Sequence, residues 1–561
     1  MFPPVGGSAI WRRVESTGAH EMKRRDFTEV SNRITPMENI LSKPLKAFLE
    51  QRVSHAVVED ADEAKITINE AVGAIAFYYE KIRSVVEYQD EHLVRQNAIR
   101  RILGRRTLLS QTTEKMAEKI LRELVRSRYF ANNTLPARNI HTIARIIERY
   151  LGIIEILQKQ RQCSDHDEEW LLAMASCAID EALVPMDDEE ALVKLMYDMV
   201  ASNVELGRFA TDNKTKAIQI YLGVYRVLLK PDTHRLRYFV LKHSFPAWTH
   251  LEEDNLAALA HSYKDVRSVI ELTINHPLGK KLFPLLRRFR IPFAVLHTII
   301  LNQPPEIFQN PEQLDAEVRK LCEGFYASQK RRLKTRSVRA FIYVFCTKMV
   351  LGMGLEIPYD LLVMHHIRFL PLSINVLFPP VLLAVIALST RFPGKDNTDR
   401  ISQAVKEIVY ADQERTVFVP RNYFAAKTNV ALYVLFTLLY VVMFGLSFTL
   451  LAWFLRAFEF NAMSGVVFVL FFCLITFFGI TLRRSVKDLI MTTAKPSLFG
   501  VFLDPLLLPI VQVGRWLSSN VSKVNVFVFV LDVLIELPLQ ALIEITEDWF
   551  QFIRDKKEEI D

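Results

Sequence analysis

Apolar residues between about residues 36 and 339 recur almost throughout at the spacing of an α-helix. The clearest stripe has apolar side chains at intervals of three and four, namely Ile143, Ile146, Ile147, Tyr150, Leu151, Ile154 and Leu157. This spacing puts them on one face of a helix, while Arg145, Glu148 and Arg149 fall on the opposite face. The pattern predicts an amphipathic helix that packs against a core.

Two further stretches repeat this pattern. A helix is expected to begin at Asp187 or Asp188, because either carboxylate can cap the free N–H groups of a first turn. Its apolar stripe consists of Leu192, Leu195, Met196 and Met199. Another stripe, with near-heptad spacing, runs from Ile75 to Leu93 and is too short to establish a coiled coil.

Prolines divide this region into roughly ten or more predicted helices. The breaks occur at Leu135-Pro136, Lys230-Pro231, His276-Pro277 and Gln303-Pro304-Pro305. No segment alternates apolar and polar residues in the way of a strand with hairpin turns. No fixed repeat emerges either, so a helical-repeat solenoid is a minor alternative.

Long apolar stretches follow a basic block that runs from Lys330 to Arg339. Four of them are predicted to span a membrane, at about residues 340–363, 371–390, 430–455 and 463–482. A span needs ~20 apolar residues to cross ~30 Å of hydrocarbon. The last two stretches carry no charge and meet this requirement outright, whereas the first contains charged residues and the second a Pro379-Pro380 break.

Two later apolar stretches leave the number of spans open between four and six. Residues 498–513 contain Asp504 and two prolines, and residues 524–545 contain Asp532 and Glu536. Either both stretches cross the membrane, or they lie in the interface as re-entrant or amphipathic segments. The prolines and carboxylates favour the second interpretation slightly.

Basic residues orient the four predicted spans. They cluster before the first span, between the second and the third, and directly after the fourth. The two connections on the other side carry one arginine each, Arg368 and Arg456. The sequence therefore predicts a multi-pass protein of the cell membrane (inner or plasma membrane) with a cytosolic N-terminus.

Composition agrees with two parts of different polarity. The 561 residues are 50% hydrophobic and 24% charged, and the mean hydropathy is +0.14. A net charge of +7 is mild for this length, so the chain is not expected to bind nucleic acid. Five scattered cysteines without a C-x-x-C pair argue against a disulfide framework or a zinc module. Residues 1–35 are expected to form a flexible arm without a cleavable signal peptide.

No motif of a known catalytic or nucleotide-binding site accompanies this organisation. The sequence contains no G-x-x-x-x-G-K-[ST] loop, no H-E-x-x-H and no G-x-S-x-G. Cys163, Asp165, His166 and Asp167 bring ligand-type residues together, but the segment fits a polar loop that ends in a helix cap. We therefore expect no cofactor, no metal site and no assignable catalytic residue.

Charged residues within the apolar stretches are the candidates for a functional site. Lys348 lies near the middle of the first predicted span, where a lysine costs ~2.5–3.5 kcal/mol, so it should have a partner. Asp532 and Glu536 are one helical turn apart and share a face. Either of them, or Asp504, is a candidate partner for Lys348.

These charges allow a functional and a structural interpretation. The functional one is a proton or ion path through the bundle. The structural one is a buried pair that fixes helix packing, or a lysine that reaches to the interface. Glu356 and Asp360 are expected at the outer end of the first span, where water reaches them.

Together these patterns predict an all-α protein with a helical domain at residues 36–339 and a transmembrane domain at residues 340–561. The favoured function is a membrane-tethered scaffold whose cytosolic helical domain binds a protein partner. One alternative is a transport or channel component that uses Lys348 and the late carboxylates, and another is a membrane enzyme of unrecognised type. The lipid bilayer is an expected partner, and homo-oligomerisation stays open.

Overall fold

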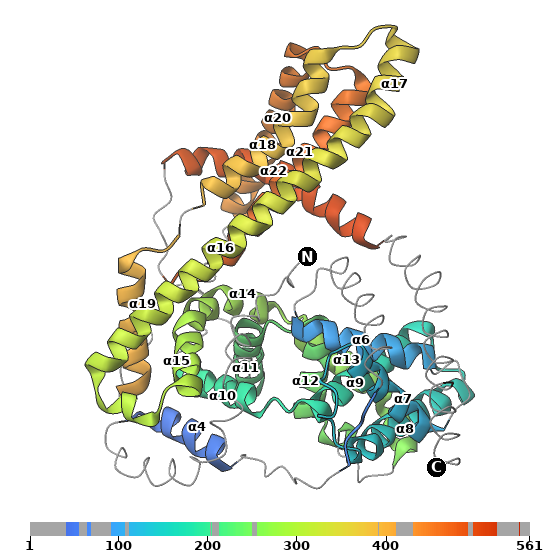
Figure 1. Cartoon of the computed structure of the whole chain (residues 1–561), viewed down its shortest axis with the longest axis vertical. Coiled ribbons are helices and arrows are strands. Elements are labelled where there is room, and N and C mark those ends of the chain that lie inside the picture. The colour runs from blue at the N-terminus through green and yellow to red at the C-terminus, as the bar shows by residue number, and fades with distance from the viewer. Residues whose placement is uncertain are drawn as a thin grey trace, which may run out of the picture.

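The computed structural model describes residues 41–54, 64–68, 91–106, 112–201, 204, 212–249, 255–390, 392–410, 430–487, 489–491, 498–523 and 549. Within these residues the secondary structure is helical and no strand forms, although an isolated bridge joins Lys65 and Pro136. The predicted all-α class is therefore confirmed. Figure 1 shows a helical domain at one end of the molecule and a bundle of long helices at the other.

The helical domain is built mainly from the helices that precede residue 303. They are α4 (Lys43–Ser54), α6 (Glu91–Arg106), α7 (Thr113–Arg126), α8 (Arg138–Lys159), α9 (Asp165–Leu183), α10 (Asp187–Ala201), α11 (Asn213–Leu229), α12 (Thr233–Ser244), η2 (Pro246–Trp248), α13 (Leu256–Ile274), α14 (Pro277–Leu286), η3 (Arg287–Phe289) and α15 (Arg290–Asn302). Their apolar faces meet in one continuous core.

The stripe predicted between Ile143 and Leu157 lies on α8 and faces this core, where all of its members except the half-buried Leu151 are buried. Arg149 is the exception to the predicted pattern. It is buried instead of exposed, because its guanidinium Nη1 donates to the carbonyl of Ala247 in η2 at 3.0 Å. A hydrogen-bond acceptor from a segment distant in sequence thus buries a side chain that the helical periodicity places on the exposed face.

Helix boundaries fall where the polar and proline signals predict them. α10 begins at Asp187 and α14 begins at Pro277. α11 ends at Leu229, and the residue that caps it, Lys230, is left-handed with φ of 50°. After α15, Pro304 precedes the short η4 (Pro305–Gln309). The near-heptad stripe from Ile75 and the predicted N-terminal arm lie outside the described residues, apart from the beginning of α6.

The predicted cap before α9 is confirmed as a capping box. Ser164 Oγ accepts from the backbone N–H of Asp167, and Asp167 Oδ2 accepts from the backbone N–H of Ser164 at 2.9 Å. The other carboxylate oxygen accepts from Tyr263 OH at 2.9 Å and is paired with Arg267. Asp167 therefore joins α9 to α13 and has a structural role in the described chain.

This carboxylate makes the stability of the helical domain sensitive to acid. Partial burial raises the pKa of Asp167, but hydrogen bonds from Ser164 and Tyr263 and the charge of Arg267 outweigh it and lower the pKa below 3.8. A carboxylate with a lowered folded-state pKa stabilises the fold above its unfolded-state pKa, and this contribution is lost as the pH falls through the folded-state pKa.

We expect Asp167→Asn to lower the free energy of unfolding at neutral pH by about 1–2 kcal/mol, because charged hydrogen bonds are lost. Denaturant titrations of the full chain in detergent at several pH values measure this difference. It should stay constant above about pH 5 and shrink below about pH 4. The exposed control Asp165→Asn should show no such trend, and a difference that does not change with pH would contradict the assignment.

α16 (Pro311–Leu351) begins in the helical domain and continues without interruption into the bundle (Figure 1). The predicted domain boundary at residue 339 thus falls inside a helix of 41 residues. Beyond Leu351, α16 continues as two π-helical segments, η5 (Gly352–Glu356) and η6 (Asp360–Met364), with α17 (Ile357–Tyr359) between them; α16 and this continuation are called the rod below. The last of these segments ends at Met364, and the residue that follows, His365, has φ of 58°.

Four helical segments among the described residues are long and apolar enough to cross a membrane, namely Pro311–Val363, Phe369–Leu388, Val434–Ala457 and Ala462–Arg483. They belong to α16 and its continuation, α18 (Phe369–Leu388), α20 (Val430–Ala457) and α21 (Ala462–Lys487). Many of their large apolar side chains are exposed, as contact with lipid requires. α18 continues through Pro379 and Pro380, where a break was expected, and both prolines are buried.

α22 (Leu498–Lys523) crosses the bundle instead of following its long axis (Figure 1). Among its described side chains, the apolar part is Leu506–Ser518. A Cβ at Gly514 would overlap the backbone carbonyl of Cys473, so only glycine lets α22 approach α21 this closely. Residues 524–545 lie outside the described residues, so the choice between four and six spans stays a prediction.

α19 (Lys395–Tyr410) comes from the connection between α18 and α20, yet it packs on the helical domain. Asn397 at its beginning joins three segments. Its Nδ2 donates to Tyr326 OH on α16 and to the carbonyl of Leu489 beyond α21, both at 2.9 Å. A helix between two candidate spans is thereby fixed to the helix that enters the bundle.

The other end of α19 is closed by a residue from the beginning of the described chain. Ser42, which precedes α4, donates from its backbone N–H to the carbonyl of Val409 at 2.8 Å. Its Oγ donates to the carbonyl of Ile408 at 2.7 Å. These bonds satisfy carbonyl groups that the last turn of a helix leaves free.

Candidate functional site: a buried polar chain in the bundle

Lys348 is the largest charged side chain that is buried in the described part of the bundle. It lies on α16 with an exposed fraction of 0%, and its Nζ donates to Asn375 Oδ1 on α18 at 2.6 Å. Its ammonium also lies 4.1 Å from the centroid of the Phe471 ring on α21, in the arrangement of a cation–π contact. Side chains from two neighbouring helices therefore replace the water that the ammonium loses.

Asn375, which accepts from Lys348, also donates a hydrogen bond to a buried carboxylate. Its Nδ2 donates to Glu356 Oε1 at 2.7 Å and lies 3.2 Å from the carbonyl of Ser464, which it also donates to. The second oxygen, Glu356 Oε2, accepts from Ser464 Oγ at 3.1 Å. One neutral amide thus bridges a buried ammonium and a buried carboxylate that make no direct ion pair.

A second carboxylate continues the chain toward the end of the bundle. Asp360 Oδ1 accepts from Asn461 Nδ2 at 2.5 Å, and Asn461 Oδ1 in turn accepts from the backbone N–H of Ser464 at 2.7 Å. Asp360 Oδ2 accepts from the backbone N–H of Arg368 at 3.2 Å. Together these groups form the polar chain, which we define as Lys348, Asn375, Glu356, Ser464, Asn461 and Asp360.

The π-helical segment η5 explains how α16 and its continuation supply three members of the polar chain. Lys348, Glu356 and Asp360 are separated by multiples of four residues, a spacing that drifts around an ordinary α-helix of 3.6 residues per turn. η5 lies between Lys348 and Glu356, and its wider turn offsets this drift, so that Glu356 stays on the face that contacts α18 and α21. Asp360 follows one turn later, after α17.

A cavity of about 650 Å³ lies beside the end of the polar chain and is lined by the connections after η6 and after α20. These connections lie at the end of the bundle away from the helical domain (Figure 1). The lining of the cavity combines Arg368, Arg456, His366 and Glu459 with several phenylalanines. Arg368 Nη1 donates to the carbonyl of Glu459 at 2.9 Å, which ties the connection after η6 to the one after α20.

The structure places the predicted site residues as follows. Lys348 is buried and has the neutral Asn375 as its hydrogen-bond partner. Asp504 lies on α22, but its side chain is outside the described part of the chain, and so are Asp532 and Glu536 altogether. A pairing of Lys348 with one of these late carboxylates therefore stays a prediction.

The expectation that water reaches Glu356 and Asp360 is wrong. Their exposed fractions are 1% and 4%, because α18 and α21 cover the end of the rod on which they lie. Sequence reasoning also missed Asn375, Ser464 and Asn461, which supply the neutral links. The available signal was a strongly hydrogen-bonding amide inside or beside an otherwise apolar helix, since such groups seek partners in a bundle.

The polar chain has two chemical capacities. Its hydrogen bonds hold α16, α18 and α21 at one register, because each carboxylate oxygen accepts at least one bond. It also contains ionisable groups in series between the middle of the bundle and the terminal cavity.

Within the described residues, no three His, Cys, Asp or Glu side chains are placed to share a metal ion. Comparisons of the chain with family models, curated proteins and solved structures give no match.

Proposed function

We propose that this chain is a multi-pass membrane scaffold, in which the bundle holds the helical domain at the cytosolic membrane surface for a protein partner. The observation that carries the proposal is the rigid connection between the two parts. α16 runs through both of them, and α19 returns from the bundle to complete the core of the helical domain. A flexible tether would need neither contact, whereas a scaffold that presents one surface in a fixed orientation benefits from both.

Charge distribution supports the proposed orientation. The basic block Lys330–Arg339 and the basic residues of α19 lie at the end of the bundle that adjoins the helical domain. The connections at the far end carry Arg368 and Arg456. Because basic residues favour the cytosolic side, the helical domain is expected in the cytosol.

In this proposal the polar chain has a structural role, which is to hold the helices of the bundle together. Its ammonium and carboxylates bind one another through neutral links, so they stabilise helix packing without a bound solute. The transport alternative keeps one observation in its favour, which is the series of ionisable groups that leads to the terminal cavity. In that alternative, Lys348 and Glu356 would exchange protons with a solute or with water.

A charge-neutral double variant, Lys348→Met with Glu356→Gln, separates the two functions. Replacing a buried charge pair by neutral groups of similar volume is often tolerated, and the introduced glutamine retains hydrogen-bonding groups for Asn375 and Ser464. We expect full-length wild type and double variant in liposomes to give the proton and ion leak of protein-free vesicles. Chemical cross-linking in native membranes should connect the same cytosolic partner to residues 41–302 of both proteins.

The matched control is Ser373→Leu, an exposed position on the same helix as Asn375. A wild-type flux that this control keeps and the double variant abolishes would replace the scaffold by the transport alternative. Absence of any partner cross-linked to the helical domain of the wild type would contradict the scaffold directly.

A further inference from the structure

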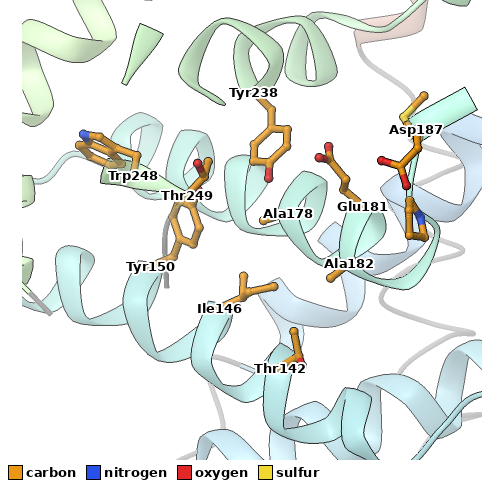
Figure 2. Close-up of a pocket in the computed structure, with 12 residues that line it drawn as sticks. Thr142, Ile146, Tyr150, Ala178, Glu181, Ala182, Asp187, Tyr238, Trp248 and Thr249 are labelled. Atoms are coloured by element: carbon orange, nitrogen blue, oxygen red, sulfur yellow. The ribbon is translucent and has the colours of Figure 1, made fainter. Parts of the chain in front are cut away.

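A second cavity lies within the helical domain, away from the polar chain. It has a volume of about 280 Å³ and is bordered by α8, α9, α12, η2 and the beginning of α10. Figure 2 shows Tyr150, Trp248 and Thr249 at one end of it, Glu181 and Asp187 at the other, and Tyr238 between them. Such a volume suits a small organic molecule.

Tyr150 gives this cavity an unsatisfied polar group. Its side chain lines the cavity with an exposed fraction of 2%, and its hydroxyl has no hydrogen-bond partner among the described residues. Burial raises the pKa of Tyr150 above its ordinary value, so the hydroxyl remains protonated and able to donate. A buried hydroxyl without a partner is costly, and a ligand oxygen that accepts from it would remove that cost.

The charge of the lining restricts the ligand further. The lining includes two carboxylates, Glu181 and Asp187, and no lysine or arginine, so an anion would find no counter-charge there. Glu181 is already bound by Lys242 at 2.7 Å and lies 3.8 Å from Arg235. Asp187 is exposed at the beginning of α10 and forms no ion pair with the described residues. The carboxylate that remains without a counter-charge is therefore Asp187, at the exposed end of the cavity.

The remaining lining is aromatic and aliphatic. Tyr150, Tyr238 and Trp248 supply ring faces, and Ile146, Ala178 and Met186 supply apolar contacts. Aromatic rings attract both flat apolar bodies and organic cations. A ligand that satisfies every part of the lining has an aromatic body, an oxygen for Tyr150 and a basic amine for Asp187.

We infer that this cavity is a binding site for a small hydroxylated aryl-alkyl amine, which would bind with its ring between Tyr150, Tyr238 and Trp248 and its ammonium beside Asp187. Such a site goes beyond the proposed scaffold and does not depend on it. A small molecule bound there would contact four helices of the helical domain at once.

Tyramine is a suitable probe, because it combines a phenol, a short chain and an amine. Calorimetric titration of the full-length protein in detergent should show saturable binding at one site per chain. Tyrosol, which has a hydroxyl in place of the amine, should bind more weakly, and the anionic phloretic acid should not bind detectably. Equal binding of tyramine and tyrosol would overturn the role of Asp187.

Two variants test the named contacts. Tyr150→Phe removes only a hydroxyl without a protein partner, so thermal stability should be unchanged or higher while tyramine binding weakens about five- to tenfold. Asp187→Asn should weaken binding about two- to fivefold at low salt. Glu155→Gln, an exposed acid on α8, is the control and should bind like the wild type. Failure of tyramine to bind the wild type, or equal binding by Tyr150→Phe, would overturn the inference.

Discussion

Replacement of Asn375 by leucine is expected to lower the free energy of unfolding of the bundle by about 3–5 kcal/mol. The amide is the only hydrogen-bonded link between Lys348 and Glu356 in the described structure, and all three side chains are buried. Leucine would fill the volume but leave an ammonium and a carboxylate without their bridging partner. Unfolding of the full chain in mixed micelles, followed by helical circular dichroism, measures the loss.

Two controls make the reason for this loss specific. Ser373→Leu adds the same side chain to an exposed position of α18 and should change the free energy of unfolding by less than about 0.5 kcal/mol. Addition of Lys348→Met and Glu356→Gln to Asn375→Leu should recover much of the stability, because no charge is then left unpaired. If the triple variant is as unstable as Asn375→Leu alone, loss of shape and not of charge pairing is responsible.

Asp180→Leu is expected to destabilise the helical domain by a similar amount, about 3–5 kcal/mol. Asp180 Oδ1 is paired with Arg95 Nε at 2.5 Å, and its Oδ2 with Arg235 Nη1 at 3.3 Å. These buried residues connect α9 to α6 and α12, and leucine would leave two guanidinium groups without this counter-charge. Denaturant titration of the full chain with a probe in the helical domain measures the effect.

The comparison for this variant is Glu118→Leu, which removes the exposed pair of Glu118 with Arg122 on α7. Exposed pairs one turn apart contribute only about 0.3–0.5 kcal/mol, so this variant should remain close to the wild type. Similar losses in the two variants would mean that burial adds nothing to the contribution of Asp180.

The sequence contains most of the information on the helices, because that information is local. The stripe of α8, the beginning of α10 at Asp187 and the proline at the beginning of α14 all depend on residues within a few turns. The four apolar stretches depend on length and composition alone. Where the expectation failed, as at Arg149 and at Pro379, a distant contact or the packed environment decided the outcome.

The candidate site was less accessible to sequence reasoning. The cost of burying Lys348 indicates that a partner exists, but its identity depends on how α16, α18 and α21 pack. The burial of Glu356 depends on the π-helical segment η5 that precedes it, and the sequence of η5 carries no local signal of this conformation. Tyr150 was expected only as a core residue, and its unsatisfied hydroxyl appears when α8, α9 and α12 are assembled.

The contribution of α19 to the helical-domain core has a consequence for biosynthesis. Ile401, Val405, Ile408 and Val409 belong to that core, and Ser42 binds the last carbonyls of the same helix. The ribosome makes the residues of α19 only after α16 and α18, and Leu489, which also joins the core, only after α21. The helical domain is therefore translated first but closes last, and until its final helix emerges an apolar groove on the nascent chain must be shielded from water.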